Sequence, residues 1–154
     1  MKAVLDHIGI AVRDLQAALA FYRDALGLEI EGVEDVDSQS VRAHFIPVGG
    51  ADASGGPRLE LLEATRPDSP IAKYVAKRGP GLHHITLQVE DLHAAVAQLK
   101  ARGVRLIDEA PRPGAEGSEI VFIHPSATDG VLIELKQGVR GGAAAHDGEG
   151  RSRS

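Results

Sequence analysis

A segment near the N-terminus recurs in the second half of the chain. Residues 6–18 (DHIGIAVRDLQAA) align with residues 83–95 (HHITLQVEDLHAA) at an offset of 77 positions. The alignment pairs His7 with His84, and eight positions between 7 and 20 are identical to their counterparts. Solenoid repeats are shorter, about 20 to 50 residues, and need at least three copies. Two copies at the observed spacing therefore predict a tandem duplication, in which each half forms one structural unit.

The ends of the two halves also correspond. The first half closes with Arg58-Leu59-Glu60-Leu61 and the second with Leu132-Ile133-Glu134-Leu135, so that Glu60 and Glu134 are 74 positions apart. Each half thus begins with an apolar segment that contains a histidine and ends with one that contains a glutamate. A single glutamate of this kind would be expected to face solvent, because an unpaired buried carboxylate costs several kcal/mol. Recurrence in both halves favours a shared buried site instead.

Two imidazoles and two carboxylates are a sufficient ligand set for one divalent cation. The predicted ligands are His7, Glu60, His84 and Glu134. Mn²⁺, Co²⁺, Zn²⁺, Ni²⁺ and Fe²⁺ all accept such ligands, and the Irving–Williams order does not choose among them. Four protein ligands leave two positions of an octahedral ion open, which suits a bidentate substrate. His83 precedes His84 but has no histidine counterpart in the first half.

The remaining histidines and a basic cluster are weaker candidates. His44 and His124 are kept as secondary site residues, because each lies close in sequence to a predicted strand of the site. We expect His93, on a predicted helix, and His146, in the tail, to be solvated. The cations of the segment 73–78 (Lys73, Lys77 and Arg78) share one predicted helix. They either contact a phosphate-bearing substrate or, as we expect, form a solvated basic face.

The apolar patterns predict the order β-α-β-β-β in both halves, which makes the fold class α+β. In the first half, residues 1–65, the predicted strands are 4–12, 28–33, 40–48 and 58–63. In the second half, residues 82–137, they are 83–89, 104–107, 120–123 and 130–136. Asp14 caps the first helix, which Gly27 ends, and a helix over 91–101 takes its place in the second half. Residues 66–81 form a linker whose helix begins at Ser69-Pro70.

Two segments are predicted to lack regular structure. The stretch 49–57 (GGADASGGP) reads as a flexible loop, because it is dominated by glycine and small residues. The tail 138–154 has almost no large apolar residue and is predicted to be disordered. Neither segment is expected to contribute to the core.

Composition limits the classes of function. The chain has 154 residues, 43% of them hydrophobic and 25% charged, which is typical of one compact globular domain. A net charge of -5 argues against nucleic acids and anionic membranes as partners. There is no cysteine, which fits a reducing compartment, and no apolar run approaches the about 18 residues of a membrane span. We expect a cytoplasmic protein without a membrane partner.

Several phrases of the chain are similar to those of a known enzyme family. They are DHIGIAV (6–12), DSPIAK (68–73), GLHHI (81–85), RLIDE-x-PRPGA (105–115) and HP-x4-GVLIEL (124–135). In this combination, over roughly residues 4–137, the chain resembles the methylmalonyl-CoA epimerases of the vicinal oxygen chelate superfamily, which also includes glyoxalase I.

The resemblance implies a fold, a reaction and a site. The fold would be two tandem βαβββ modules with a metal site in the sheet cleft. The reaction would be interconversion of the (2R) and (2S) forms of methylmalonyl-CoA through an enolate. His7, Glu60, His84 and Glu134 would bind a divalent metal ion such as Co²⁺, Mn²⁺, Zn²⁺ or Ni²⁺. Glu134 would also act as an acid/base catalyst, and members of the superfamily often form homodimers.

The chain departs from the family pattern at three positions. Some relatives carry a glutamate where this chain has Ala43, so the second acid/base would be a water molecule, His44 through a bulge, or another group. Many relatives also have a lysine after His-Pro and a glycine pair before the final strand, where Ser126 and Asp129 stand here. These two differences leave the contacts of the CoA phosphates open.

Other members of the superfamily supply the alternative functions. A glyoxalase I-like lactoylglutathione lyase would use the same ligand set on a glutathione hemithioacetal. Extradiol dioxygenases generally take their ligands from one module, whereas both modules are equipped here. A small-molecule binding protein of the bleomycin-sequestering type would need no metal ligands. The phrases DSPIAK and HP-x4-GVLIEL favour the epimerase.

Overall fold

The computed structural model describes residues 1–49 and 56–138, which form a mixed α+β fold around one curved sheet. Its strands are β1 (Ala3–Ala11), β2 (Gly32–Val36), β3 (Val41–Pro47), β4 (Arg58–Ala64), β5 (Gly81–Val89), β6 (Arg112–Pro113), β7 (Glu119–Ile123) and β8 (Ile133–Gln137). Its helices are α1 (Leu15–Leu19), continued by a π-helical segment (Ala20–Ala25), α2 (Pro70–Arg78) and α3 (Leu92–Ala101). Short 3₁₀ turns occupy Asp37–Gln39, Ala115–Gly117 and Pro125–Ala127.

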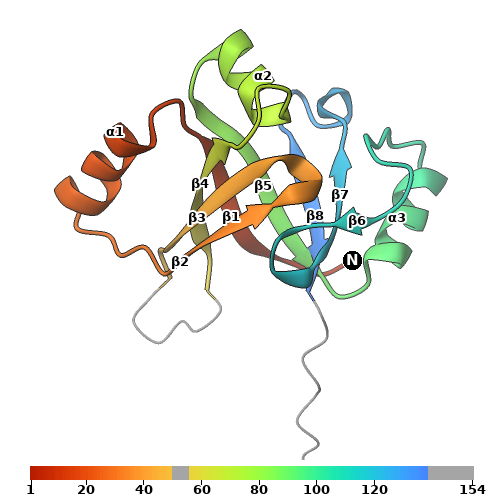
Figure 1. Ribbon diagram of the computed structural model, residues 1–154. Coiled ribbons are helices and arrows are strands. Elements are labelled where there is room, and N and C mark those ends of the chain that lie inside the picture. The colour runs from red at the N-terminus through yellow and green to blue at the C-terminus, as the bar shows by residue number, and fades with distance from the viewer. Residues whose placement is uncertain (50–55, 139–154) are drawn as a thin grey trace, which may run out of the picture.

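The order of the strands repeats the duplication. The sheet runs β2-β3-β4-β1-β5-β8-β7-β6, so that each half contributes four strands in the same relative order. The two halves join where β1 pairs antiparallel with β5, and in each half the last strand pairs parallel with the first. The sheet curls until β2 and β6 lie in front of the central strands (Figure 1). The predicted α+β fold with two tandem modules is confirmed.

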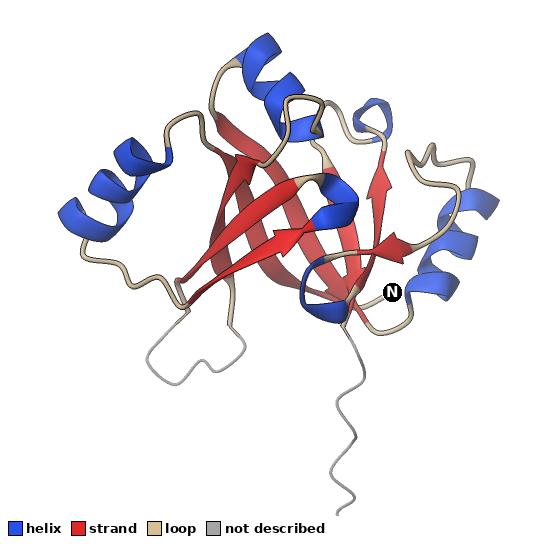
Figure 2. Ribbon diagram, in the orientation of Figure 1, coloured by secondary structure: helices blue, strands red, loops and turns tan. Residues whose placement is uncertain are grey.

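α1 and α3 lie at opposite sides of this sheet, and α2 lies at its upper end (Figure 1 and Figure 2). α1 packs with Ile46 and Leu61 on the outer face of the first half. α3 packs in the corresponding way on Val121 and Leu135 of the second half. α2 has no counterpart, and its residue Ile71 packs against the inner face of the first half. The strands beneath α1 and α3 therefore bury apolar side chains on their outer face.

The helix boundaries follow the capping residues that the sequence predicts. Asp14 and Asp91 accept hydrogen bonds from the backbone N–H groups of Ala17 and Ala94, at 3.2 and 2.9 Å. Ser69 caps α2 in the same manner. These side chains satisfy N–H groups that have no partner inside a helix, and each helix begins directly after its cap.

The observed strands differ from the predicted ones at three places. The strand predicted over 28–33 begins only at Gly32, because Leu28 and Ile30 pack into the cluster beneath α1. The strand predicted over 104–107 is reduced to a single bridge at Leu106. The carboxylate of Asp108 ends the pairing there, because it accepts the hydrogen bond from the Phe122 N–H at 2.7 Å. The outermost strand is instead β6, which lies outside all the predicted strands.

Other predictions lie outside the described residues. Most of the predicted loop, residues 50–55, and the predicted tail from residue 139 onward belong to that part of the chain.

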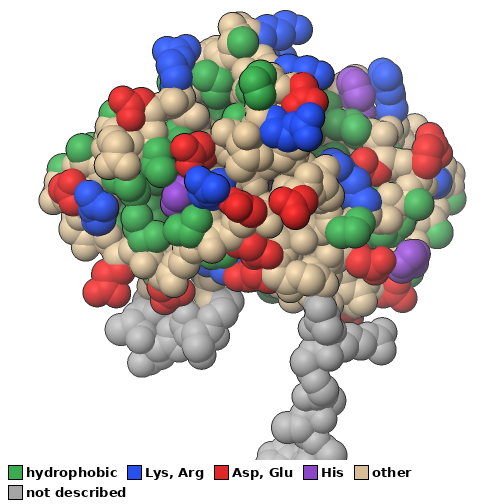
Figure 3. Space-filling view, in the orientation of Figure 1, with side chains coloured by type: hydrophobic (Ala, Val, Ile, Leu, Met, Phe, Trp, Pro, Cys, Tyr) green, Lys and Arg blue, Asp and Glu red, His purple; other side chains and the backbone are tan. Residues whose placement is uncertain are grey.

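Acidic and basic side chains intermingle over the face of the molecule in Figure 3. Within the described residues, no helix combines the length and apolar character that crossing a membrane requires.

Candidate metal centre

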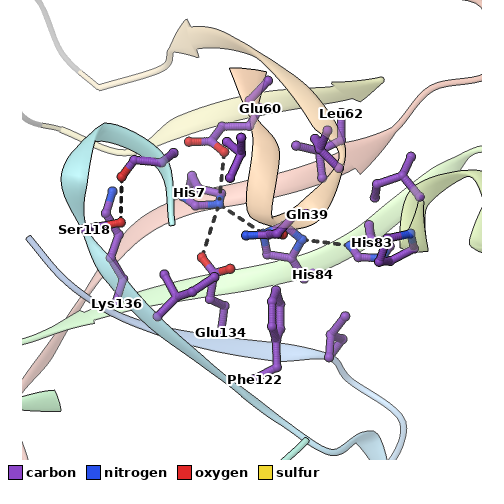
Figure 4. Close-up of a pocket in the computed structure, with 18 of the residues that line it drawn as sticks. His7, Gln39, Glu60, Leu62, His83, His84, Ser118, Phe122, Glu134 and Lys136 are labelled. Carbon is purple, nitrogen blue, oxygen red and sulfur yellow. Dashed lines mark hydrogen bonds and ion pairs between the residues drawn. The ribbon is translucent and has the colours of Figure 1, made fainter. Parts of the chain in front are cut away.

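The four predicted ligands come from the four central strands of the sheet. His7 lies on β1, Glu60 on β4, His84 on β5 and Glu134 on β8, and their side chains meet on the inner face (Figure 4). All four are between 3% and 7% exposed. The structure therefore brings together residues that are up to 127 positions apart in the sequence, and it does so through strand pairing alone.

The Nε2 atom of His7 is the hub of this cluster. It lies 3.0 Å from Nε2 of His84, 3.2 Å from Oε2 of Glu60 and 3.9 Å from Oε1 of Glu134. Ligand atoms of His7, His84 and Glu134 all fall within 4.8 Å of one another. Glu60 approaches His7 from the other side in Figure 4. His7 thus belongs to both sides of the cluster: it lies with His84 and Glu134 on one side and with Glu60 on the other, and all four side chains line the same cavity.

The ring of His7 is held from behind by a charged pair. Its Nδ1 donates a hydrogen bond to Oδ2 of Asp6 at 2.6 Å, and Nζ of Lys136 donates to both Asp6 oxygens at 3.1 and 3.2 Å. Burial alone would raise the pKa of Asp6, but the His7 hydrogen bond and the Lys136 charge outweigh it and lower the pKa to about 2. Asp6 is therefore an ionised acceptor at neutral pH.

Neighbouring residues determine both the space available to the His84 ring and its protonation. Gly9 lies opposite His84 in the β1–β5 pairing, and a Cβ atom at this position would overlap the imidazole. Nδ1 of His84 lies 2.9 Å from Nδ1 of His83. Burial, followed by the nearby His7 and His83, holds the pKa of His84 well below its usual value. His84 is thus a neutral imidazole, the form that binds metals.

The two glutamates are buried acids whose charges are partly balanced. Burial raises the pKa of Glu134 to about 7, although His7 and a 2.9 Å hydrogen bond from the Thr86 hydroxyl oppose this. Burial also raises the pKa of Glu60, against the opposing charges of His7 and Arg58. Arg58 lies 3.2 Å from the Glu60 carboxylate and 2.9 Å from Glu116.

This set of groups fits a divalent cation. Two carboxylates and two imidazoles crowd into a volume from which water is largely excluded, and both carboxyl groups hold protons more tightly there than in water. A cation in the same volume would favour the ionised form of both carboxylates and accept the imidazole lone pairs. The ligand types admit Co²⁺, Mn²⁺, Zn²⁺ or Ni²⁺ equally.

A cavity of about 200 Å³ opens in front of the cluster. Its first wall, from β3, β4 and α2, is apolar and includes Val41, Ala43, Leu62 and Ile71. The second half of the chain contributes apolar side chains, among them Ile120 and Phe122, together with the polar side chains of Arg112, Ser118 and Lys136. A small polar molecule with an apolar substituent would find matching surfaces on the two sides.

The weaker candidates lie away from the cluster. His44 points to the other face of β3, where its Nε2 lies 3.4 Å from Glu63. His124 bonds Ser126, and His93 is exposed near Glu119. His146 lies outside the described residues.

The predicted basic helix is α2. Lys77 and Arg78 line a separate cavity of about 490 Å³ beside His83, whereas Lys73 is exposed and lines neither cavity.

The sequence prediction missed the residues that support the ligands. Asp6 contacts His7 and Thr86 contacts Glu134, whereas Lys136 bonds Asp6 behind the cluster, and all three are at least half-buried polar groups. One signal was available for Asp6, because the 77-residue offset pairs it with His83 just as it pairs the two ligand histidines. Thr86 aligns with Gly9, and this difference between the halves carries no signal in one sequence.

Comparisons with known proteins were made with both sequence and structure. A family model described as the Glyoxalase/Bleomycin resistance protein/Dioxygenase superfamily matches residues 6–122. The chain is 42% identical to the uncharacterized protein YqjC of Bacillus subtilis, covering 85% of this chain and 89% of that protein. It is 38% identical to the ethylmalonyl-CoA/methylmalonyl-CoA epimerase of Cereibacter sphaeroides, covering 86% and 96%. A variant of Streptomyces coelicolor methylmalonyl-CoA epimerase, solved with 2-nitronate-propionyl-CoA, superposes with a TM-score of 0.83 at 39% identity and covers 91% of this chain and 97% of that chain.

Proposed function

The chain belongs to the Glyoxalase/Bleomycin resistance protein/Dioxygenase superfamily, and from this premise we propose that it is a methylmalonyl-CoA epimerase. It interconverts the (2R) and (2S) forms of the thioester by removing and returning the proton at C2. The observation that carries the proposal is the convergence of His7, Glu60, His84 and Glu134 at one end of a cavity, with an acid of near-neutral pKa among them. The epimerases among its relatives support the same reaction.

The cofactor of this reaction is one divalent metal ion, held by His7, Glu60, His84 and Glu134. When bound, such an ion supplies Lewis acidity, which stabilises the negative charge of an enolate oxygen. Lys136 and Arg112 line the cavity and add positive charge for the substrate's carboxylate. The Ser118 hydroxyl lines the same side and is a further hydrogen-bond donor for that group.

Glu134 transfers the proton on one face of C2. The Thr86 hydroxyl donates to its Oε1 and so fixes the carboxyl group against the floor of the cavity. Burial raises the pKa of this carboxyl group in the metal-free protein and a bound cation would lower it again, so Glu134 would be an ionised base that accepts the C2 proton. Epimerisation also requires a proton on the opposite face. At Ala43, where some relatives carry a glutamate, the cavity wall is apolar and His44 faces away, so a water molecule serves this role.

The proposal is tested by proton exchange at C2. Metal-reconstituted protein is incubated with (2R)-methylmalonyl-CoA in D₂O, and both C2 deuteration and the epimer ratio are followed. We expect metal-dependent deuteration with conversion to the (2S) form, slowed about 100- to 10,000-fold in Glu134→Gln, because general acid–base catalysis contributes that much. His93→Gln, which changes an exposed histidine outside the cavity, is the matched control.

Metal binding without C2 exchange above the uncatalysed rate would overturn the epimerase assignment. A glutathione hemithioacetal is then the next substrate, because glyoxalase I-like enzymes use the same ligand types. Ethylmalonyl-CoA belongs in the same series, since the apolar wall at Ala43 and Leu62 has no polar group that would reject a longer alkyl substituent.

We also propose that the protein works as a cytoplasmic homodimer. Three apolar side chains on the two central strands are exposed on the face opposite the metal cluster, namely Leu5, Leu82 and Ile85. Because these strands are related by the duplication, their outer surface is suited to a self-complementary contact with a second copy. Light scattering should give twice the 16.2 kDa chain mass. Ile85→Lys should yield monomers, whereas Val33→Lys, on the edge strand β2, should not.

A further inference from the structure

Two residues outside the ligand set occupy equivalent positions in the two halves. Asp6 precedes His7 and His83 precedes His84, and the offset of 77 pairs these dipeptides with each other. Each of the two residues contacts the Nδ1 atom of the histidine that follows it. The distances are 2.6 Å for Asp6 Oδ2 and 2.9 Å for His83 Nδ1. Both halves therefore place a side chain in contact with Nδ1 of the ligand histidine, but this side chain is a carboxylate in the first half and an imidazole in the second.

In the first half this position carries a negative charge. Both oxygens of Asp6 accept hydrogen bonds from Nζ of Lys136, a buried cation that comes from β8 of the other half. A carboxylate has no hydrogen to donate, so Nδ1 of His7 must be the donor of their 2.6 Å contact. In the neutral imidazole the lone pair then lies on Nε2, which is the atom that faces the other three ligands.

In the second half the same position is neutral and is held by an aromatic contact. The ring of His83 packs edge-to-face on Tyr74, with ring centroids 4.7 Å apart, and the Tyr74 hydroxyl donates to the Leu82 carbonyl at 2.6 Å. This contact leaves Nδ1 of His83 directed at Nδ1 of His84 (Figure 4). One of the two nitrogen atoms must donate to the other. If His84 donates, its Nε2 also carries a lone pair toward the cluster.

We propose that Asp6 and His83 are positioning residues that fix the ligand tautomers, each by accepting the Nδ1 proton of the following histidine. Both Nε2 lone pairs are thereby presented to the cation. The proposal rests on the metal site of the proposed function but not on the acyl-CoA reaction. Asp6 also lies near Glu60 and His7, within 4.8 Å, but its oxygens are engaged by Lys136 and Nδ1, so it acts behind His7 and not as a ligand.

Asp6 and His83 should support metal binding in different ways. The Asp6 carboxylate both orients the His7 ring and makes its Nε2 a stronger electron donor, as carboxylate–histidine pairs do at metal sites. His83 has no charge to contribute and acts through orientation and tautomer only. An amide side chain at position 83 should therefore replace His83, because its oxygen accepts the same proton, whereas a phenyl ring should keep the Tyr74 contact but accept nothing.

The test is the Zn²⁺ affinity of the apoprotein, measured by competition with a chromophoric chelator. We expect His83→Phe and Asp6→Ala to weaken binding about 10- to 100-fold, the usual range for such partners of a ligand. His83→Gln should restore most of the affinity, and His93→Phe should bind like the unchanged chain. Circular dichroism checks that each variant is folded, and His83→Gln separates the lost acceptor from a packing defect.

Nitrogen-15 NMR of the Zn²⁺-bound protein gives an independent readout. We expect a protonated Nδ1 and a metal-bound Nε2 for both His7 and His84 in the unchanged chain. If the unchanged chain binds no Zn²⁺, the proposed metal site itself fails. If it binds one Zn²⁺ but His83→Phe binds equally well, or if His84 binds the metal through Nδ1, the positioning role is overturned while the metal site stands.

Discussion

At the scale of single residues, one pair of equivalent positions beside the proposed ligand histidines differs between the two halves. The equivalent positions Gly9 and Thr86 face the two ligand histidines across the β1–β5 pairing, Gly9 opposite His84 and Thr86 opposite His7. Gly9 makes room for the ring of His84, whereas Thr86 donates a hydrogen bond to Glu134. The two histidines therefore have different neighbours across the strand pairing. His84 faces a glycine, which leaves space for its ring, and His7 faces a hydrogen-bonding threonine.

Because Gly9 leaves space for the His84 ring, adding one methyl group at position 9 should weaken metal binding. In Gly9→Ala the added Cβ overlaps the His84 imidazole, which is buried and cannot retreat without losing its place in the cluster. We expect Zn²⁺ affinity to fall at least about tenfold, since the ligand is displaced and not merely reoriented. Gly32→Ala is the matched control, because a Cβ there meets Phe45 at an ordinary 3.6 Å. Equal affinities for the two variants would show that the ring moves freely.

The buried acid predicts how metal binding depends on pH. Burial raises the pKa of Glu134 to about 7, so the metal-free protein keeps this proton below neutrality, and the metal must displace it. The affinity should therefore rise about tenfold for each pH unit up to about 7 and level off above it. Glu60, whose pKa burial also raises, adds to this slope, whereas burial lowers the pKa values of His83 (to about 4) and of His84, so that these two histidines add none. Titrating Zn²⁺ affinity between about pH 5.5 and 8.5 measures the slope, and a flat profile would contradict the assignment.

At the scale of helices and strands, the features that depend only on residues nearby in the sequence could be predicted. The caps Asp14, Ser69 and Asp91 are sequence-local, and the helices begin where they indicate. The wrong strand over 104–107 is a long-range effect: Asp108 takes the hydrogen bond of Phe122 that a neighbouring strand would have used. The four ligands were predictable from the repeat, but Lys136 was not, because its role depends on β8 lying near Asp6 in space.

The caps give a prediction that separates stability from the site. Asp91→Ala removes the side chain that accepts from the Ala94 N–H at 2.9 Å, at the start of a helix that packs on the outer face of the sheet. We expect the free energy of unfolding to fall by about 1 kcal/mol. Urea denaturation measures this loss, while Zn²⁺ affinity should stay unchanged because α3 contributes no residue to the cavity. A change in affinity with no loss of stability would mean that α3 positions the site.

At the scale of the whole molecule, the four proposed metal ligands are divided equally between the two halves. His7 and Glu60 come from the first, His84 and Glu134 from the second, and the halves meet along a single strand pairing. A cation held by both halves therefore binds only when this pairing is formed. Binding to the folded state alone must stabilise it, by about 2.7 kcal/mol when the free metal is 100-fold above its dissociation constant.

Metal removal should consequently lower the melting temperature of the intact chain. For a domain of this size, about 2.7 kcal/mol corresponds to a shift of several degrees. Calorimetry with and without a chelator should give this difference for the unchanged chain, and no difference for His84→Ala or for Glu60→Ala, because each removes a ligand from one half. If either variant kept the full metal-dependent shift, the replaced residue would not be a ligand of the cation. If both variants kept it, the cation would be held by neither His84 nor Glu60, and the proposed division of the ligands between the two modules would be wrong.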